Sequence, residues 1–325
     1  MSKADARASL DALRGRDLLS AADLGPDAWR SLLDLASALK AEWSATGHHE
    51  RELLRGRALA LVFEHPSLRT RVSTELAVGQ LGGQSIYLLG GDVGIGRRES
   101  AFDVGRTLAA WVAAIVARTL RDETVRQLAA GAGVPVINAL TDREHPLQAV
   151  ADVLTVAEAY GGLEGRTIAF IGDGNNVAAS LAIAVTSLGG IMRLATPPGY
   201  APPDDLLAVA EERARQTGGR LELVRDPLMA ARGATILYTD VWTSMGMEAE
   251  RDRRLADLAG YTVSRALLAV AEPGARVMHC LPAHPGEEIE AELLEGPVSL
   301  IARQAQNRLH ATKAVLAVLL SYPES

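Results

Sequence analysis

The chain has 325 residues, 48% of them apolar and 22% charged, and a formal net charge of −7. That length suits two domains of about 150 residues, each with its own core. The negative charge, without a run of Lys or Arg, argues against nucleic acid and anionic membrane as partners. The single cysteine, Cys280, excludes an intrachain disulfide framework, and neither a membrane span nor a signal peptide is visible. We therefore expect a cytoplasmic protein.

The first elements are a helix from Pro26 to about Trp43 and an apolar strand, Ala58–Phe63, which Pro66 prevents from continuing. The next helix runs to Gln80, and Ser67 is placed to cap it. The start of a helix carries unpaired N–H groups and a partial positive charge, so it suits an anion. The alternative is an ordinary capped helix with solvated arginines. A phosphate site is predicted from two hydroxyls and two guanidiniums in five residues: Ser67, Arg69, Thr70 and Arg71.

Strands and helices then alternate, which implies a mostly parallel sheet. The loop 90–100 has four glycines and two arginines, which fits either a mobile segment near an anion or a solvated loop. The strand Ala114–Ala117 leads directly to Arg118. Ligands of open α/β sheets bind at the carboxyl ends of strands, so Arg118 is a ligand candidate. The other elements expected here are strand Ser85–Leu89, helix Ala101–Ala113, helix Glu123–Ala130 and strand Val134–Asn138.

His145 and Gln148 open a helix that runs to about Tyr160, with Pro146 at its first position. The two polar side chains lie one turn apart on one face, where they can bind a carbonyl and an amide together. A lone His is more often structural. A change of domain is indicated by the glycines that follow the helix, Gly161, Gly162 and Gly165.

The turn Gly172–Asn176 lies between the strand Thr167–Ile171 and a helix that runs to Leu188. A dinucleotide fingerprint is the alternative for such a turn, and it fails on two counts. Val177 stands where the third glycine is needed, and no acidic residue ends the next strand, Ile191–Ala195.

Polar loops follow the last predicted strands. Asp240 and Ser244 follow the strand Thr235–Thr239 and could hold an amino group and a carboxylate, although both residue types are common in loops.

The strand Arg276–Met278 is followed by three possible metal ligands, His279, Cys280 and His284. A structural zinc site needs a fourth ligand, which they lack. The thiol of Cys280 could also be a nucleophile or simply a small buried group. The remaining expected elements are a helix from Pro202, the strand Leu221–Val224 and a last helix from about Gln306 to Tyr322.

Six segments resemble, in order along the chain, the motifs of the aspartate and ornithine carbamoyltransferase family, and four of them are typical of the ornithine enzymes. The segments are Phe63–Arg71, His145–Gln148, Gly172–Asn176, Asp240–Gly246, His279–Pro282 and Asn307–His310. The resemblance implies an α/β fold of two domains, each a mostly parallel sheet flanked by helices. Residues 1–150 would bind carbamoyl phosphate, with the C-terminal helix 306–325 packed back on them, and residues 151–305 would bind ornithine. It also implies a homotrimer or a multiple of trimers.

The activity implied by the resemblance is transfer of the carbamoyl group of carbamoyl phosphate to the δ-amine of L-ornithine, which gives L-citrulline and phosphate in arginine metabolism. No metal, cofactor or covalent intermediate is required. The catalytic residues would be Arg69, Arg118, His145, Cys280 and Arg308. Carbamoyl phosphate would be bound by Ser67, Leu68, Arg69, Thr70, Arg118, His145, Gln148, Cys280, Leu281 and Arg308. Ornithine would be bound by Asn176, Asp240, Ser244 and Met245.

Four positions depart from the family pattern: His65, Leu68, Gly94 and Gln306. Gly94 replaces a side chain that touches the phosphate bound to a neighbouring subunit, and Arg97 or Arg98 could compensate. Two alternatives stay open, namely a catalytically silent relative and a carbamoyltransferase for another amine such as putrescine. The sequence does not decide between synthesis and breakdown of citrulline.

Overall fold

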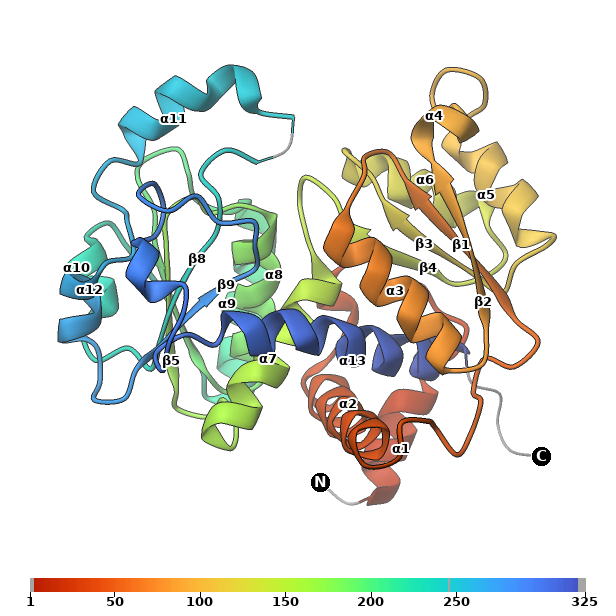
Figure 1. The fold of residues 1–325 in the computed structure, drawn as a ribbon, viewed down its shortest axis with the longest axis horizontal. Coiled ribbons are helices and arrows are strands. Elements are labelled where there is room, and N and C mark those ends of the chain that lie inside the picture. Colours follow the sequence, from red (N-terminus) through yellow and green to blue (C-terminus); the bar gives the residue numbers. More distant parts are fainter. Residues whose placement is uncertain (1–2, 245, 321–325) are drawn as a thin grey trace. The chain divides into compact units, whose positions relative to one another are not determined.

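The structure is a computed structural model that describes residues 3–244 and 246–320. The chain divides into two compact units, Met1–Leu154 with Asn307–Ser325, and Thr155–Gln306. Each unit contains one parallel sheet with helices packed beside it (Figure 1). The expected α/β fold with two sheets is therefore confirmed. No helix in the described ranges is long and apolar enough to cross a membrane.

The sheet of the first unit has the strand order β2-β1-β3-β4, and all of its strand pairs are parallel. β1 is buried from Leu59 to Phe63, as expected for a strand covered on both faces. Because β1 pairs with both β2 and β3, the strand order reverses beside it, and a ligand site is expected at the carboxyl ends of β1 and β3. The strands are β1 (Ala58–Phe63), β2 (Gln84–Leu89), β3 (Ala114–Arg118) and β4 (Val136–Leu140).

The helices of the first unit connect these strands or come from the two ends of the chain. The connecting helices are α3 (Leu68–Gln80), α4 (Gly90–Val93), α5 (Ala101–Ala109) and α6 (Asp122–Gly131). The remaining helices that contribute to this unit are α1 (Lys3–Asp11), η1 (Ala21–Asp23), α2 (Pro26–Thr46), α7 (Pro146–Tyr160) and α13 (Ile301–Leu320).

The sheet of the second unit has the order β7-β6-β5-β8-β9 and is also parallel throughout. The reversal of strand order lies at β5, which pairs with β6 and β8. α8 is buried along its whole length from Val177 to Ser187, which explains why it has no polar face. The strands are β5 (Thr167–Ile171), β6 (Ile191–Ala195), β7 (Arg220–Val224), β8 (Ile236–Thr239) and β9 (Arg276–His279). The helices are α8 (Asn176–Ser187), α9 (Asp204–Thr217), α10 (Pro227–Ala231), η2 (Glu248–Glu250), α11 (Arg251–Asp257), α12 (Arg265–Val270) and η3 (Ala291–Leu293).

Several predicted boundaries are wrong for local reasons. The helix predicted to reach Ala113 ends at Ala109, because the Ala113 N–H already donates to Ala58 O beside β1. The last helix begins at Ile301 rather than Gln306, after Ser299, whose hydroxyl accepts from the Ile301 N–H. Its predicted end at Tyr322 lies outside the described residues. The short helices α4, α10, α11 and α12 were not predicted.

Candidate active site

The first predicted ligand site is the start of α3, directly after β1. Ser67 occupies the N-cap position, with extended backbone angles, but its side chain accepts no hydrogen bond from the helix. The predicted N-cap position of Ser67 is therefore confirmed, but its hydroxyl does not supply the hydrogen bond that usually accompanies it. The first N–H groups of a helix have no partner within it, so this start suits an anion. Leu68 is 75% exposed there, while Arg69 is half-buried.

Three predicted residues of the first unit contact the guanidinium of Arg308, and a fourth, Arg118, contacts one of the three. Arg308 Nη2 donates to Thr70 Oγ1 at 3.1 Å, and Arg308 Nη1 donates to His145 Nε2 at 3.1 Å and to Gln148 Oε1. Arg118 Nη1 also donates to Thr70 Oγ1, at 3.2 Å. Because Thr70 accepts in both contacts, neither of them uses its hydroxyl proton. The four elements that supply this cluster are α3, β3, α7 and α13.

His145 is buried, and its environment keeps it neutral. Burial, with the positive charges of Arg308, Arg118 and Arg69, holds the pKa of His145 well below 6.5. An arginine can only donate, so His145 Nε2 accepts in its contact with Arg308. The imidazole proton is then on Nδ1. For His145 to donate from Nε2 to a carbonyl oxygen, its tautomer has to change.

Glu64, which the sequence analysis did not select, shapes the carboxyl end of the first sheet. Its side chain accepts from the Leu120 N–H at 2.5 Å, and its own N–H donates to Arg118 O at 2.9 Å. The residue therefore holds the segment that follows β3 against the one that follows β1. Its position directly after the buried strand was the available signal.

The second group of predicted residues gathers around Asp240, which follows β8. Asn175 Nδ2 donates to Asp240 Oδ2 at 2.7 Å, and Cys280 Sγ donates to Asp240 Oδ1 at 2.9 Å. Asn175 is also the N-cap of α8, since its Oδ1 accepts from Val177 N at 3.0 Å. Asn176, the predicted ligand, is the first residue of α8 and half-buried. The contact to Asp240 thus comes from Asn175, a residue that the sequence analysis did not assign.

The loop after β9 is held by a buried histidine and a buried glutamate. Leu281 N donates to His279 Nδ1 at 2.8 Å, so the proton of His279 is on Nε2, which contacts Glu288 Oε1 at 3.2 Å. Leu281 has a φ of 62°, a left-handed conformation that is costly for a leucine. Although His279, Cys280 and Asp240 lie close together, both ring nitrogens of His279 are used, so this group does not fit a metal ion. Glu288 is not among the residues predicted from the sequence.

A buried ion pair links the turn Gly172–Asn176 to the segment that follows Asp240. Arg254 of α11 donates to the Asp173 carboxylate, and its Nε donates to Trp242 O at 2.5 Å. Burial raises the pKa of Asp173 to about 6, against the opposing effect of Arg254. Gly172 precedes this pair with a φ of 127°, and a Cβ there would lie 3.1 Å from Trp242 Nε1. The turn therefore requires glycine.

The other two predicted ornithine ligands lie in the loop after Trp242. Ser244 is half-buried, and its carbonyl accepts from Met247 N at 3.0 Å. Among the residues that the structure describes, no hydrogen bond links the Ser244 side chain to Asp240. Met245 lies outside the described residues.

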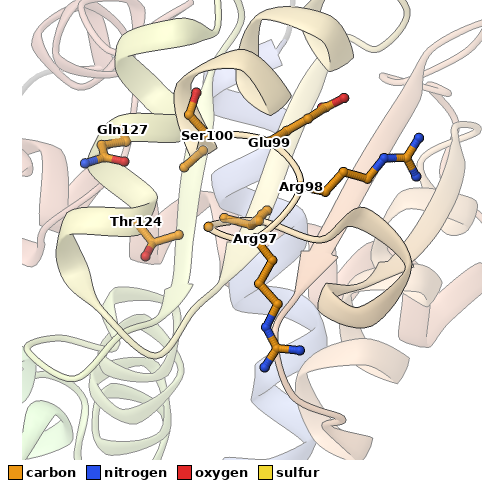
Figure 2. A pocket seen from close by; sticks show the side chains of 9 residues that line it. Arg97, Arg98, Glu99, Ser100, Thr124 and Gln127 are labelled. Carbon is orange, nitrogen blue, oxygen red and sulfur yellow. The ribbon is translucent and has the colours of Figure 1, made fainter.

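The loop 90–100 forms part of a separate pocket of about 460 Å³ in the first unit (Figure 2). The side chains of Arg97 and Arg98 point in different directions there, and both are exposed. Gly94 has a φ of 71°, and a Cβ on it would lie 2.9 Å from Arg98 Cβ, so this backbone accounts for the departure from a larger residue. The pocket is lined by Ile95, Gly96, Arg97, Arg98, Glu99, Ser100, Ala101, Thr124 and Gln127.

Comparison with known proteins agrees with this geometry over nearly the whole chain. The family model "Aspartate/ornithine carbamoyltransferase, carbamoyl-P binding domain" matches residues 16–158, and the model of the Asp/Orn binding domain matches residues 164–319. The ornithine carbamoyltransferase of Ignicoccus hospitalis is 49% identical over 95% of this chain and 99% of its own length, and that of Thermus thermophilus is 50% identical over 94% and 97%. The solved structure of the Pyrococcus furiosus ornithine carbamoyltransferase superposes with a TM-score of 0.91 at 44% identity, covering 95% of this chain and 98% of that one. The chain therefore belongs to the aspartate/ornithine carbamoyltransferase family, among its ornithine carbamoyltransferases.

Proposed function

We propose that the chain transfers the carbamoyl group of carbamoyl phosphate to the δ-amine of L-ornithine, with the first unit binding carbamoyl phosphate and the second binding ornithine. The observation that carries this assignment is the convergence of Thr70, His145 and Gln148 on Arg308, with Arg118 joined to the group through Thr70. A cluster of two guanidiniums, a hydroxyl, an imidazole and an amide suits a ligand that is both an anion and an amide.

The phosphate is held at the start of α3. Ser67, the Leu68 N–H, Arg69 and Thr70 are the donors, and they follow directly from the buried strand β1. The departure at Leu68 is compatible with this role, because its N–H belongs to the first turn and its exposed side chain is not needed.

The carbonyl oxygen of the carbamoyl group faces Arg118, His145 and Thr70. As the amine attacks, a C–N bond forms, negative charge builds on this oxygen, and the C–O bond to phosphate breaks. Preorganised donors at the position of developing charge usually supply the largest catalytic contribution. Gln148 holds the carbamoyl amide, and Arg308 closes on the same group.

Ornithine is held by the second unit. Asn176, Asp240, Ser244 and Met245 bind its α-amino acid end. Cys280 and Leu281 lie where the two substrates meet, so they contact carbamoyl phosphate on the side of the reacting amine. The free amine has a pKa near ~10.4, so at neutral pH it must lose a proton before it attacks. Cys280 is the first residue after β9, and its thiol donates to Asp240 Oδ1. The Asp240 carboxylate therefore lies one hydrogen bond from the side on which the amine reacts.

The chain assembles as a homotrimer in the cytoplasm. Support for an oligomer comes from an exposed apolar stripe on α3, where Leu68 is 75%, Val72 42% and Leu76 47% exposed, and from Ile86 on the edge strand β2, which is 49% exposed. Residues four apart lie on one face of a helix. A contiguous exposed apolar surface usually marks an interface.

An amine panel tests the proposed reaction. Purified protein with carbamoyl phosphate is offered ornithine, putrescine and aspartate, and carbamoylated product is measured for each. Citrulline should form with ornithine, and the other amines should react little. A preference for another amine overturns the substrate assignment, and the absence of any product identifies a silent relative.

A further inference from the structure

Gln148 is held between two groups of opposite hydrogen-bonding character. Its Nε2 donates to Asp152 Oδ1 at 2.7 Å, and its Oε1 accepts from Arg308 Nη1. Gln148 is 1% exposed, and Asp152, one turn further along α7, is fully buried. Both contacts lie within the first unit.

These contacts fix which way the Gln148 amide faces. A carboxylate can only accept and a guanidinium can only donate, so each requires the same orientation of the amide. Reversing it would turn the amide oxygen toward the Asp152 carboxylate and the NH2 toward Arg308. Both buried hydrogen bonds would then be replaced by unfavourable contacts.

We propose that Asp152 is a positioning residue that sets selectivity for a carbamoyl group. By holding the Gln148 NH2, Asp152 keeps Oε1 directed toward the ligand, and an amide oxygen has two lone pairs, so it can accept from Arg308 and from a ligand N–H together. The carbamoyl group supplies such an N–H, whereas an acetyl group offers a methyl in the same place. Asp152 itself touches no substrate. This inference rests on the proposed carbamoyl-phosphate site.

Asp152 matters most while Arg308 contacts the ligand. Once the guanidinium turns toward the carbamoyl group, its hold on Oε1 weakens, and the carboxylate becomes the group that prevents reversal of the amide. In Asp152→Asn the new side chain presents an oxygen and an NH2, so it pairs with either orientation of Gln148. In Asp152→Leu no acceptor remains.

The test compares dissociation constants for carbamoyl phosphate, acetyl phosphate and inorganic phosphate, measured by calorimetry on the whole protein. We expect the preference for carbamoyl over acetyl phosphate to fall about threefold or more in Asp152→Asn and about tenfold or more in Asp152→Leu, with phosphate affinity within about twofold of wild type. In a Gln148→Leu background, Asp152→Asn should leave the preference unchanged. Asp122→Asn is the matched control, because Asp122 is also buried but pairs with Arg126.

Three results overturn the inference. They are an unchanged preference in Asp152→Asn, an equal loss of affinity for all three ligands, and a further fall when Asp152 is replaced in the Gln148→Leu background. Asp152→Asn is close to isosteric, so it decides the question if the leucine variant does not fold. If wild-type protein binds no carbamoyl phosphate, it is the proposed function that fails instead.

Discussion

Arg69 lies in the first turn of α3, close enough to His145 for its charge to lower the pKa of that histidine. We expect Arg69→Ala to lower kcat/KM by roughly 150-fold, about 3 kcal/mol, because it removes a charge-assisted contact to the phosphate and the developing charge. The melting temperature should change little, since Arg69 is only half-buried. Steady-state kinetics with a thermal melt separates the two effects. Activity within about threefold of wild type would exclude Arg69 from the site.

The raised pKa of Asp173 leads us to expect that the KM for ornithine depends on pH. Burial raises the pKa of Asp173 to about 6, so its carboxylate takes up a proton as the pH falls through that value. The protonated group loses its ion pair with Arg254, and the Trp242 segment, held by the same guanidinium, loosens. We expect the KM for ornithine to rise about tenfold below pH 6.

Asp173→Asn is the control for this profile, because it mimics the protonated group at every pH. It should show a raised KM for ornithine at pH 8 and a flatter profile below pH 6 than wild type. The protonation of ornithine itself affects both proteins alike, so the comparison removes it. Parallel KM profiles for the two proteins would contradict the role of Asp173.

Single residues of the site were predictable where they follow a buried strand. Arg118 is the last residue of β3 and Asp240 follows β8, and parallel strands bring their carboxyl ends to one edge of a sheet. Arg254 was not predictable, since it is 81 residues from Asp173 and nothing in its sequence distinguishes it from the neighbouring Arg253, which pairs with Glu250 instead. The pairing is decided by tertiary packing.

At the scale of elements, α13 is fastened to α2 by polar contacts in an apolar setting. Lys313 is fully buried, and its Nζ lies 2.9 Å from His49 Nε2 and 4.1 Å from the centre of the Trp43 ring. Lys40 Nζ also donates to Asn307 Oδ1 at 2.7 Å. Because Asn307 precedes Arg308, these contacts place α13 where its arginine reaches His145.

Lys313 makes the stability of this helix pair depend on pH. Burial lowers the pKa of Lys313 from 10.5 to about 8. Between these values the folded protein has released a proton that the unfolded chain still holds, so the contribution of Lys313 to the free energy of unfolding rises with pH. The rise is at most about 3 kcal/mol over that window.

Lys313→Met, which keeps the length and removes the charge, should lack this contribution. Chemical denaturation of both proteins from pH 7 to 10.5 measures their free energies of unfolding. The other titrating groups are the same in both proteins, so the difference between the two curves reports Lys313. The stability of wild type relative to the variant should increase with pH. A difference that stays constant, or decreases, would contradict the placement of Lys313 in an apolar environment.

Long apolar elements were predictable, and short or polar ones were not. β1 and β5 lie where continuous apolar runs predicted them, because strands buried on both faces need such runs. α10 and α12 have five and six residues, too few for a helical period to be visible in the sequence. The start of α13 was missed although Gly296 and Pro297 mark a turn shortly before it, and Ser299 then accepts from the Ile301 N–H.

At the scale of the whole molecule, the apolar stripe on α3 predicts assembly. If the proposed trimer forms through this stripe, Val72→Glu with Leu76→Glu should lower the mass in sedimentation to that of a monomer, because burying charges in an apolar interface is costly. If a neighbouring copy supplies residues 90–100 to the active site, activity should fall as the trimer dissociates. Leu223→Glu is the matched control, since Leu223 is 56% exposed on the edge strand β7. An unchanged mass for the double variant would place the interface elsewhere.

The two units are proposed to bind different substrates, and a pair of substitutions, one in each unit, tests this assignment most directly. Arg308→Gln changes the cluster of the first unit, and Asp240→Asn changes the contacts with Asn175 and Cys280 in the second. Two quantities are measured for each variant: the dissociation constant for carbamoyl phosphate by calorimetry, and kcat/KM for ornithine.

We predict that Arg308→Gln loses carbamoyl-phosphate affinity about tenfold or more, since it removes charge-assisted contacts. Asp240→Asn should keep that affinity within about twofold of wild type while kcat/KM for ornithine falls about tenfold or more. Equal losses of carbamoyl-phosphate affinity in the two variants would contradict the assignment of one substrate to each unit.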